Sequence, residues 1–166
     1  MTSVATYSRT QSVTYVTDNI LKSLKDLVRL IGMSPDKLIG NWASNHLAVS
    51  TWLASEHLER VVLEVFDPAT SKLVTRWDID ISYSWSAGDG NFWVDTEQLR
   101  YSIKKTGLAP EKCSYRLLLK TKPGEAKVLG WDDTIFLSTE SLVRHSVGST
   151  IEHNGLGASA AYWRTA

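Results

Sequence analysis

The residues best placed to do chemistry are Asp78 and Asp80, two aspartates separated by one residue in the alternating run 73–81. Residues two apart project from the same face of a β-strand, so the two carboxylates would lie side by side. Nucleotidyltransferases hold Mg²⁺ with such a pair. That site also needs an upstream Gly-Ser turn and a third acid, whereas Gly148 and Ser149 lie downstream. We therefore interpret the aspartates as part of the solvated face of a half-buried strand.

The other nucleophilic and metal-binding residue types give no enzyme signature. The four histidines, whose spacing fits no metal site, are His46, His57, His145 and His153. The single cysteine, Cys113, excludes an internal disulfide and a cysteine-based zinc site. Cys113 begins an apolar strand, so we expect a buried structural thiol rather than a nucleophile. Neither a Gly-x-Ser-x-Gly elbow nor a phosphate-binding loop occurs. The sequence predicts a protein that is not an enzyme and has no metal or other cofactor.

Length and charge restrict the class of protein further. A chain of 166 residues fits one domain. The 18 basic and 18 acidic residues cancel, so no electrostatic footprint for nucleic acid or an anionic membrane is visible. The apolar runs are far shorter than the ~20 residues that span a bilayer, and the N-terminus does not resemble a signal peptide. We expect a cytoplasmic domain without a direct nucleic-acid or membrane partner.

The first third of the chain has the pattern of helices. Residues 4–10 alternate loosely and predict a short strand or a flexible arm. A long amphipathic helix then follows, with Ser12 as its N-cap and Gly32 as its stop. Its apolar positions recur at spacings of three and four, at Val13, Val16, Ile20, Leu24, Leu27 and Ile31. Ser34 and Pro35 restart a helix that reaches residue 55, with a possible break near Ser44.

The remainder has the pattern of strands around one helix. Residues 58–66 and 73–81 form a hairpin with a turn at 67–71. An exposed loop follows at 88–91, and a capped helix runs from Asp95 to Gly107. Residues 113–121 form another strand, and a long polar connection leads to a final hairpin that turns at Asn154 and Gly155. The order of these elements predicts an α+β domain.

Several short motifs, in this order, resemble HORMA-domain proteins of the spindle checkpoint. Residues 76–81 read Arg-Trp-Asp-Ile-Asp-Ile, similar to a signature of the family's central strand. Residues 113–121, CSYRLLLKT, are similar to a later strand of the family, and Trp131 follows in the family's order. Residues 149–154 and 160–162 are similar to the family's C-terminal motifs. The short length and the N-terminal region look more like the bacterial branch.

The resemblance implies a HORMA-like fold, an antiparallel sheet backed by helices with a C-terminal β-hairpin "safety belt". The single domain 1–166 would comprise a core of about 11–122 and a belt of about 123–166. A closure peptide from another protein would add to a sheet edge made by Ser114, Tyr115, Arg116, Leu117, Leu118, Leu119 and Lys120. The belt that crosses it would include Trp131, Phe136, Leu142, Val143, Ile151, Leu156, Tyr162 and Trp163. A proline at Arg116 or Leu118 should then remove an N–H that the peptide needs.

The resemblance also implies two protein partners. Bacterial HORMA proteins of cyclic-oligonucleotide-based anti-phage signalling bind a cGAS-like nucleotidyltransferase. An AAA+ ATPase of the pachytene-checkpoint type remodels them, and its handle here would be the N-terminal residues Thr2, Ser3, Val4, Ala5 and Thr6. The resemblance thus implies a non-enzymatic, peptide-binding conformational switch. The alternative is a constitutive scaffold subunit of a complex without an open–closed cycle.

Overall fold

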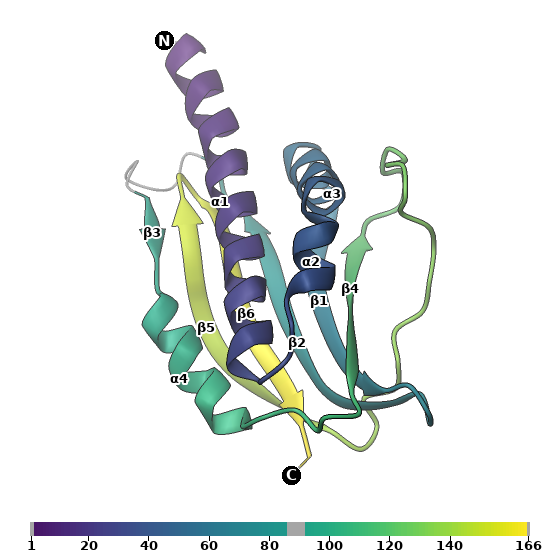
Figure 1. The fold of residues 1–166 in the computed structure, drawn as a ribbon. Coiled ribbons are helices and arrows are strands. Elements are labelled where there is room, and N and C mark those ends of the chain that lie inside the picture. The colour runs from purple at the N-terminus through teal and green to yellow at the C-terminus, as the bar shows by residue number, and fades with distance from the viewer. Residues whose placement is uncertain (1, 86–91, 166) are drawn as a thin grey trace.

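The structure, a computed structural model, describes residues 2–85 and 92–165 and has helices on one side of a sheet (Figure 1). In chain order the elements are α1 (Thr2–Leu30), α2 (Asp36–Gly40), α3 (Trp42–Ala54), β1 (Leu58–Asp67), β2 (Lys72–Tyr83), β3 (Trp93–Val94), α4 (Thr96–Thr106), β4 (Ser114–Thr121), β5 (Val143–His153) and β6 (Leu156–Arg164). This order confirms the predicted α+β class. The loop predicted at 88–91 lies outside the described residues.

The strands form one antiparallel sheet in the order β3-β5-β6-β2-β1-β4. The predicted hairpin of β1 and β2 lies in the middle, and β4 forms one edge by pairing with β1. The C-terminal strand β6 pairs with β2 on its other side. The final hairpin turns at Asn154 and Gly155, whose φ angles of 52° and 86° fit a tight hairpin turn.

Helix α1 is longer than the sequence predicted. It begins at Thr2, so residues 4–10 form neither a strand nor a flexible arm, and Ser12 is a buried helical residue rather than an N-cap. No proline or glycine interrupts the chain before Gly32, where a φ of 86° ends the helical region as expected. The predicted apolar stripe is confirmed, since five of its six positions, from Val16 to Ile31, are buried.

The ends of the shorter helices agree only in part with the predicted ones. The break between α2 and α3 falls at Asn41 rather than near Ser44. The Asp95 carboxylate caps α4 by accepting a hydrogen bond from the Gln98 backbone N–H at 2.9 Å. The Gln98 side chain does not complete a capping box, because its amide donates to the Val147 carbonyl on β5. This bond ties α4 to the C-terminal hairpin.

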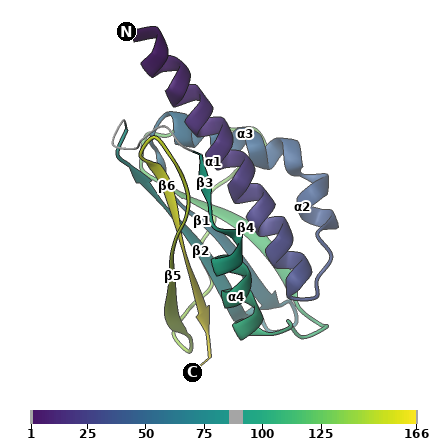
Figure 2. The same ribbon diagram turned by 90° about the vertical axis from the view of Figure 1, so that its left-hand side faces the viewer.

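The core lies between the sheet and the helices, which cover a single face of it (Figures 1 and 2). In the regular stretch of β1 from residue 60 to 65 and in the parts of β2 and β4 that pair with it, odd-numbered residues point toward the helices, among them Leu63, Trp77 and Tyr115. Even-numbered residues therefore point to the opposite face, which we call the far face. The C-terminal hairpin contributes Ile151, Leu156 and other side chains to the same core. The hairpin is thus an integral part of the sheet and of its core.

Candidate functional site

The outer edge of β4 presents backbone groups that no strand of the described chain pairs with. The Tyr115 carbonyl accepts a hydrogen bond from Lys37 Nζ at 3.0 Å, so it points away from β1. In contrast, the Lys122 N–H donates to the His57 carbonyl just before β1, at 2.7 Å. The N–H and C=O of one residue point to the same side of an antiparallel strand, and the side alternates along the strand. The outward-facing backbone groups therefore belong to Tyr115, Leu117, Leu119 and Thr121.

This alternation corrects the predicted effect of proline. Arg116 and Leu118 turn their side chains outward to the far face, but their N–H groups point inward to β1, opposite Glu64 and Val62. Proline at either position would break the sheet rather than the peptide's pairing. The direction of a side chain in a strand does not give the direction of the N–H of the same residue, because the two are perpendicular.

A groove runs along this edge beneath the chain that follows β4. Two cavities, of about 390 and 260 Å³, flank Trp131 and are lined on one side by β4. The larger reaches residues 118–121, and the smaller reaches residues 115–117. Trp52 and Phe136 line the larger cavity, and Lys37 lines the smaller one. The groove thus combines open backbone groups with aromatic side chains.

The roof of the groove is residues 123–142, which we call the belt crossing. On the helix side, Trp52 Nε1 donates to the Ala126 carbonyl at 2.7 Å, and Trp131 Nε1 donates to Ser44. The chain then passes outside β4, as Figure 1 shows, and residues 132–134 line the larger cavity. On the far face, the Leu137 N–H donates to Glu64 Oε2 at 2.7 Å. The belt crossing therefore wraps the sheet edge from one face to the other.

The predicted site residues separate into two groups. All seven edge residues lie on β4, and Trp131 and Phe136 lie in the belt crossing beside them. Of the remaining predicted belt residues, Leu142 ends the belt crossing without lining either cavity. The others belong to the C-terminal hairpin; they are Val143, Ile151, Leu156, Tyr162 and Trp163. Sequence reasoning missed Trp52 and Lys37, which only the packing of α2 and α3 brings to the edge.

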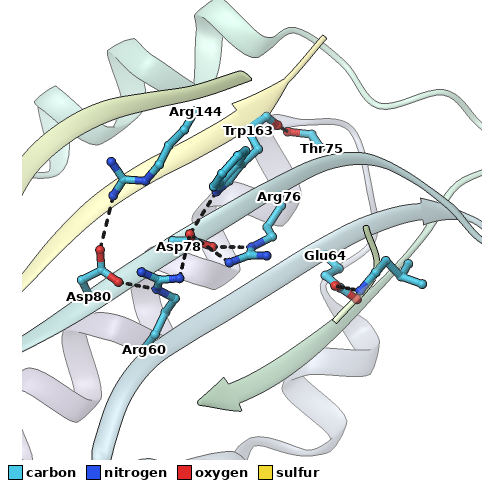
Figure 3. A network of polar contacts seen from close by, with 9 residues as sticks. Arg60, Glu64, Thr75, Arg76, Asp78, Asp80, Arg144 and Trp163 are labelled. Carbon is cyan, nitrogen blue, oxygen red and sulfur yellow. Dashed lines mark hydrogen bonds and ion pairs between the residues drawn. The ribbon is translucent and has the colours of Figure 1, made fainter. Parts of the chain in front are cut away.

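The far face of the sheet is not solvated at Asp78, contrary to the prediction for this residue. The Asp78 side chain is 0% exposed and accepts hydrogen bonds from Arg76 Nε at 2.7 Å and Trp163 Nε1 at 3.0 Å (Figure 3). Arg60 also lies 3.7 Å from the carboxylate, and pairs with the partly exposed Asp80. Because cations and N–H donors occupy its oxygens, the Asp78 carboxylate is a structural anchor for β6 rather than a metal ligand.

A row of polar and aromatic side chains crosses the far face at one level of the sheet. From β4 to β5 the register places in line Arg116, Glu64, Arg76, Trp163 and Arg144. Glu64 is also 0% exposed and pairs with Arg116, whose Nε lies 2.6 Å from Glu64 Oε1. No alternation rule identifies Glu64 as buried, because the belt crossing and a neighbouring arginine together cover it.

The other residues singled out from the sequence have structural contacts. Cys113 is partly buried, and burial raises the pKa of its thiol, which fits the predicted structural role. His46 contacts Asp18, and the buried His153 bonds to Ser12 at 2.7 Å. Within the described residues, no group of three His, Cys, Asp or Glu side chains could hold a metal ion. None of the helices described is long and apolar enough to cross a bilayer.

The comparison with protein families decides the assignment. The sequence matches the family described as bacterial HORMA domain 2 over residues 1–166. The chain belongs to this family. The sheet backed by helices, with a C-terminal hairpin paired to β2, is therefore the HORMA fold that the motif order predicted. No curated protein is similar enough to count as a match.

Solved structures have the same fold at very low sequence identity. A chain of the mitotic checkpoint complex has a TM-score of 0.74 and 8% identity, covering 93% of this chain and 98% of that one. C. elegans HTP-2 bound to the HIM-3 closure motif has a TM-score of 0.63 and 10% identity, covering 86% and 85%. A chain of the E. coli MS115-1 CdnC:HORMA-deltaN complex has a TM-score of 0.58 and 8% identity, covering 95% and 89%.

Proposed function

We propose that this HORMA domain captures a closure peptide from another protein as an added strand on β4. The observation that carries the proposal is an edge strand with outward backbone groups that faces a groove roofed by the protein's own belt crossing. An open edge pairs readily with an extended peptide, because backbone hydrogen bonds supply affinity whatever the sequence. HTP-2, which has a similar fold, is bound to a closure motif in its solved structure.

The groove also restricts the register of the peptide. Lys37 already occupies the Tyr115 carbonyl, so the pairing would be carried by Leu117, Leu119 and Thr121. Side chains of an added strand alternate between the two faces. One set would point toward Trp131 on the helix side, and the other toward Phe136 on the far side. The peptide would therefore be extended, with apolar side chains where it passes each of these two rings.

The experiment uses a peptide selected from a displayed random library against the full-length protein. Amide hydrogen exchange is then measured with and without this peptide. Added protection at the Leu117 and Leu119 amides is expected, whereas the Leu118 amide, which already bonds to β1, should change little. Protection confined to the β3–β5 edge, or absent from β4, would refute edge capture. A titration that detects no binding of any selected peptide would favour the constitutive scaffold instead.

The proposed partners of the captured state are a cGAS-like nucleotidyltransferase, which it would activate in anti-phage defence, and an AAA+ ATPase that would reset it. Support for the first comes from the E. coli CdnC:HORMA-deltaN complex, whose chain has a similar fold. The AAA+ ATPase would engage the N-terminal residues Thr2–Thr6 as its handle. These residues begin α1 and do not form the flexible arm predicted. Co-expression with each candidate followed by size-exclusion chromatography tests the pairings. Separate elution of all three proteins, with and without the selected peptide, would contradict both.

A further inference from the structure

Glu64, which Figure 3 shows on β1, and Arg116 of β4 fasten the belt crossing to the far face just after it has rounded the β4 edge. Glu64 Oε2 accepts a hydrogen bond from the Leu137 N–H at 2.7 Å, and Arg116 Nη2 donates to the Ile135 carbonyl at 2.8 Å. The two side chains also pair with each other at 2.6 Å. These bonds close a ring that joins β1, β4 and the backbone of the belt crossing.

Hydrogen bonds and charge, rather than burial of the Ile135 side chain, hold the belt crossing at this point. The Ile135 side chain is 82% exposed, so hydrophobic burial there contributes little. The Glu64 carboxylate, in contrast, is fully buried, and a buried carboxylate without partners is very unfavourable. Departure of the belt crossing would exchange the hydrogen bond from the Leu137 N–H for water, and a bond to a charged group is worth more than this exchange returns. The polar ring is therefore the main local attachment of the belt crossing.

A second contact connects this attachment to the C-terminal hairpin. The Phe136 ring lies over the Arg76 guanidinium at 5.1 Å, and the Trp163 ring lies 5.6 Å from the same group. The Asp78 carboxylate accepts hydrogen bonds from Nε and Nη2 of Arg76 and so holds this guanidinium in place. The belt crossing and the last strand thus share one guanidinium, so loosening either one weakens the packing of the other.

We propose that the belt crossing is a gate over the groove and that the Glu64–Arg116 pair is the latch that holds this gate closed. The latch sets how fast a peptide enters and leaves the groove without setting how tightly the peptide binds. This inference rests on the peptide capture proposed above. Both latch bonds go to the protein's own backbone, so they close the gate with and without a peptide. Weakening the latch raises the open fraction of both forms equally. Association and dissociation then accelerate by the same factor, and the dissociation constant stays unchanged.

The test compares Arg116→Gln with the wild type and with Arg100→Gln. Arg100 is an exposed arginine of α4 whose pairing with Asp26, at 3.6 Å, lies away from the belt crossing, so it controls for loss of charge. Arg116→Lys keeps the charge beside Glu64 but loses the forked geometry that reaches both partners. It serves as the second variant if Arg116→Gln does not fold. Readouts are the exchange rate of the Leu137 amide in the free protein and the binding kinetics of the library-selected peptide.

We expect Arg116→Gln to accelerate Leu137 exchange and both peptide rate constants by about ten- to a hundredfold, from the loss of charge-assisted hydrogen bonds. Arg100→Gln should change none of them. Faster dissociation alone would make Arg116 a direct peptide contact and overturn the gate. Unchanged Leu137 exchange would overturn the latch itself. If the wild type binds no peptide, the proposed function fails, while the exchange of Leu137 still decides whether the latch exists.

Discussion

Proline substitution at adjacent positions of β4 should separate folding from peptide binding. Leu118→Pro removes an N–H that bonds to β1 and leaves a carbonyl unpaired beside Val62, where both side chains are buried. The unpaired acceptor costs about 1–3 kcal/mol, and the smaller side chain about 1 kcal/mol more. The free energy of unfolding should therefore fall by about 2–4 kcal/mol. At about 2–4 °C per kcal/mol, Tm should fall by roughly 4–16 °C.

Leu117→Pro should have the opposite profile. Its N–H points out of the sheet, so the ladder survives, and the loss of partly buried side-chain carbon costs about 1 kcal/mol and roughly 2–4 °C. The peptide loses one donor, and its unpaired carbonyl under the belt crossing weakens binding by about 5- to 150-fold. Thermal melts and titrations with the library-selected peptide give both numbers. Equal losses of Tm in the two variants, or wild-type affinity in Leu117→Pro, would refute the assigned alternation.

Three further changes test other parts of the structure. Asp78→Asn leaves a buried arginine without its anion and should lower stability by about 3–5 kcal/mol in urea denaturation; a loss below about 1 kcal/mol would contradict its role as an anchor. A hydrogen bond from Lys112 lowers the pKa of Asp67, so this pair stabilises the fold above the ordinary carboxyl pKa and loses its effect as pH falls through the lowered value. In Lys112→Gln, NMR titration should find the Asp67 pKa raised, with the stability deficit present at pH 7 and fading in acid. Lys37→Met frees the Tyr115 carbonyl and should extend peptide-induced hydrogen-exchange protection of β4 toward Tyr115; an unchanged protected length would show that Lys37 does not limit the register.

The elements that could be predicted from the sequence are those whose signals lie within a few residues of one another. Asn154 and Gly155 gave the hairpin, Asp95 gave the start of α4, and the spacing of Leu24 and its neighbours gave the buried face of α1. The extension of α1 was missed because β-branched residues in the first ten positions weaken helix propensity. In the structure that helix continues without a break to Leu30, since cooperative extension from a packed helix offsets a weak local preference.

The candidate site could be predicted only in part for a related reason. The order of motifs placed β4 at an edge, because the resemblance carries topology. Burial of Glu64 and Asp78 depends on contacts from residues 73 and 85 positions further along the chain. An alternating pattern reports only which side of a strand a residue faces. Which segments later cover that side is decided by the long-range return of the belt crossing and of β6.

The length of α1 has a mechanical consequence. Its N-terminal end projects beyond the sheet as a continuous helix (Figures 1 and 2). Moving inward, its contacts include the ion pair of Arg9 with Glu56 at 3.5 Å and the bond of Ser12 to His153 beside the hairpin turn. A motor that pulled on this end would act on a continuous helix, which transmits force directly, and not on a flexible segment that must first be extended. The force would arrive at the hairpin turn while the sheet beneath was still intact, so the last two strands would be peeled from their tip.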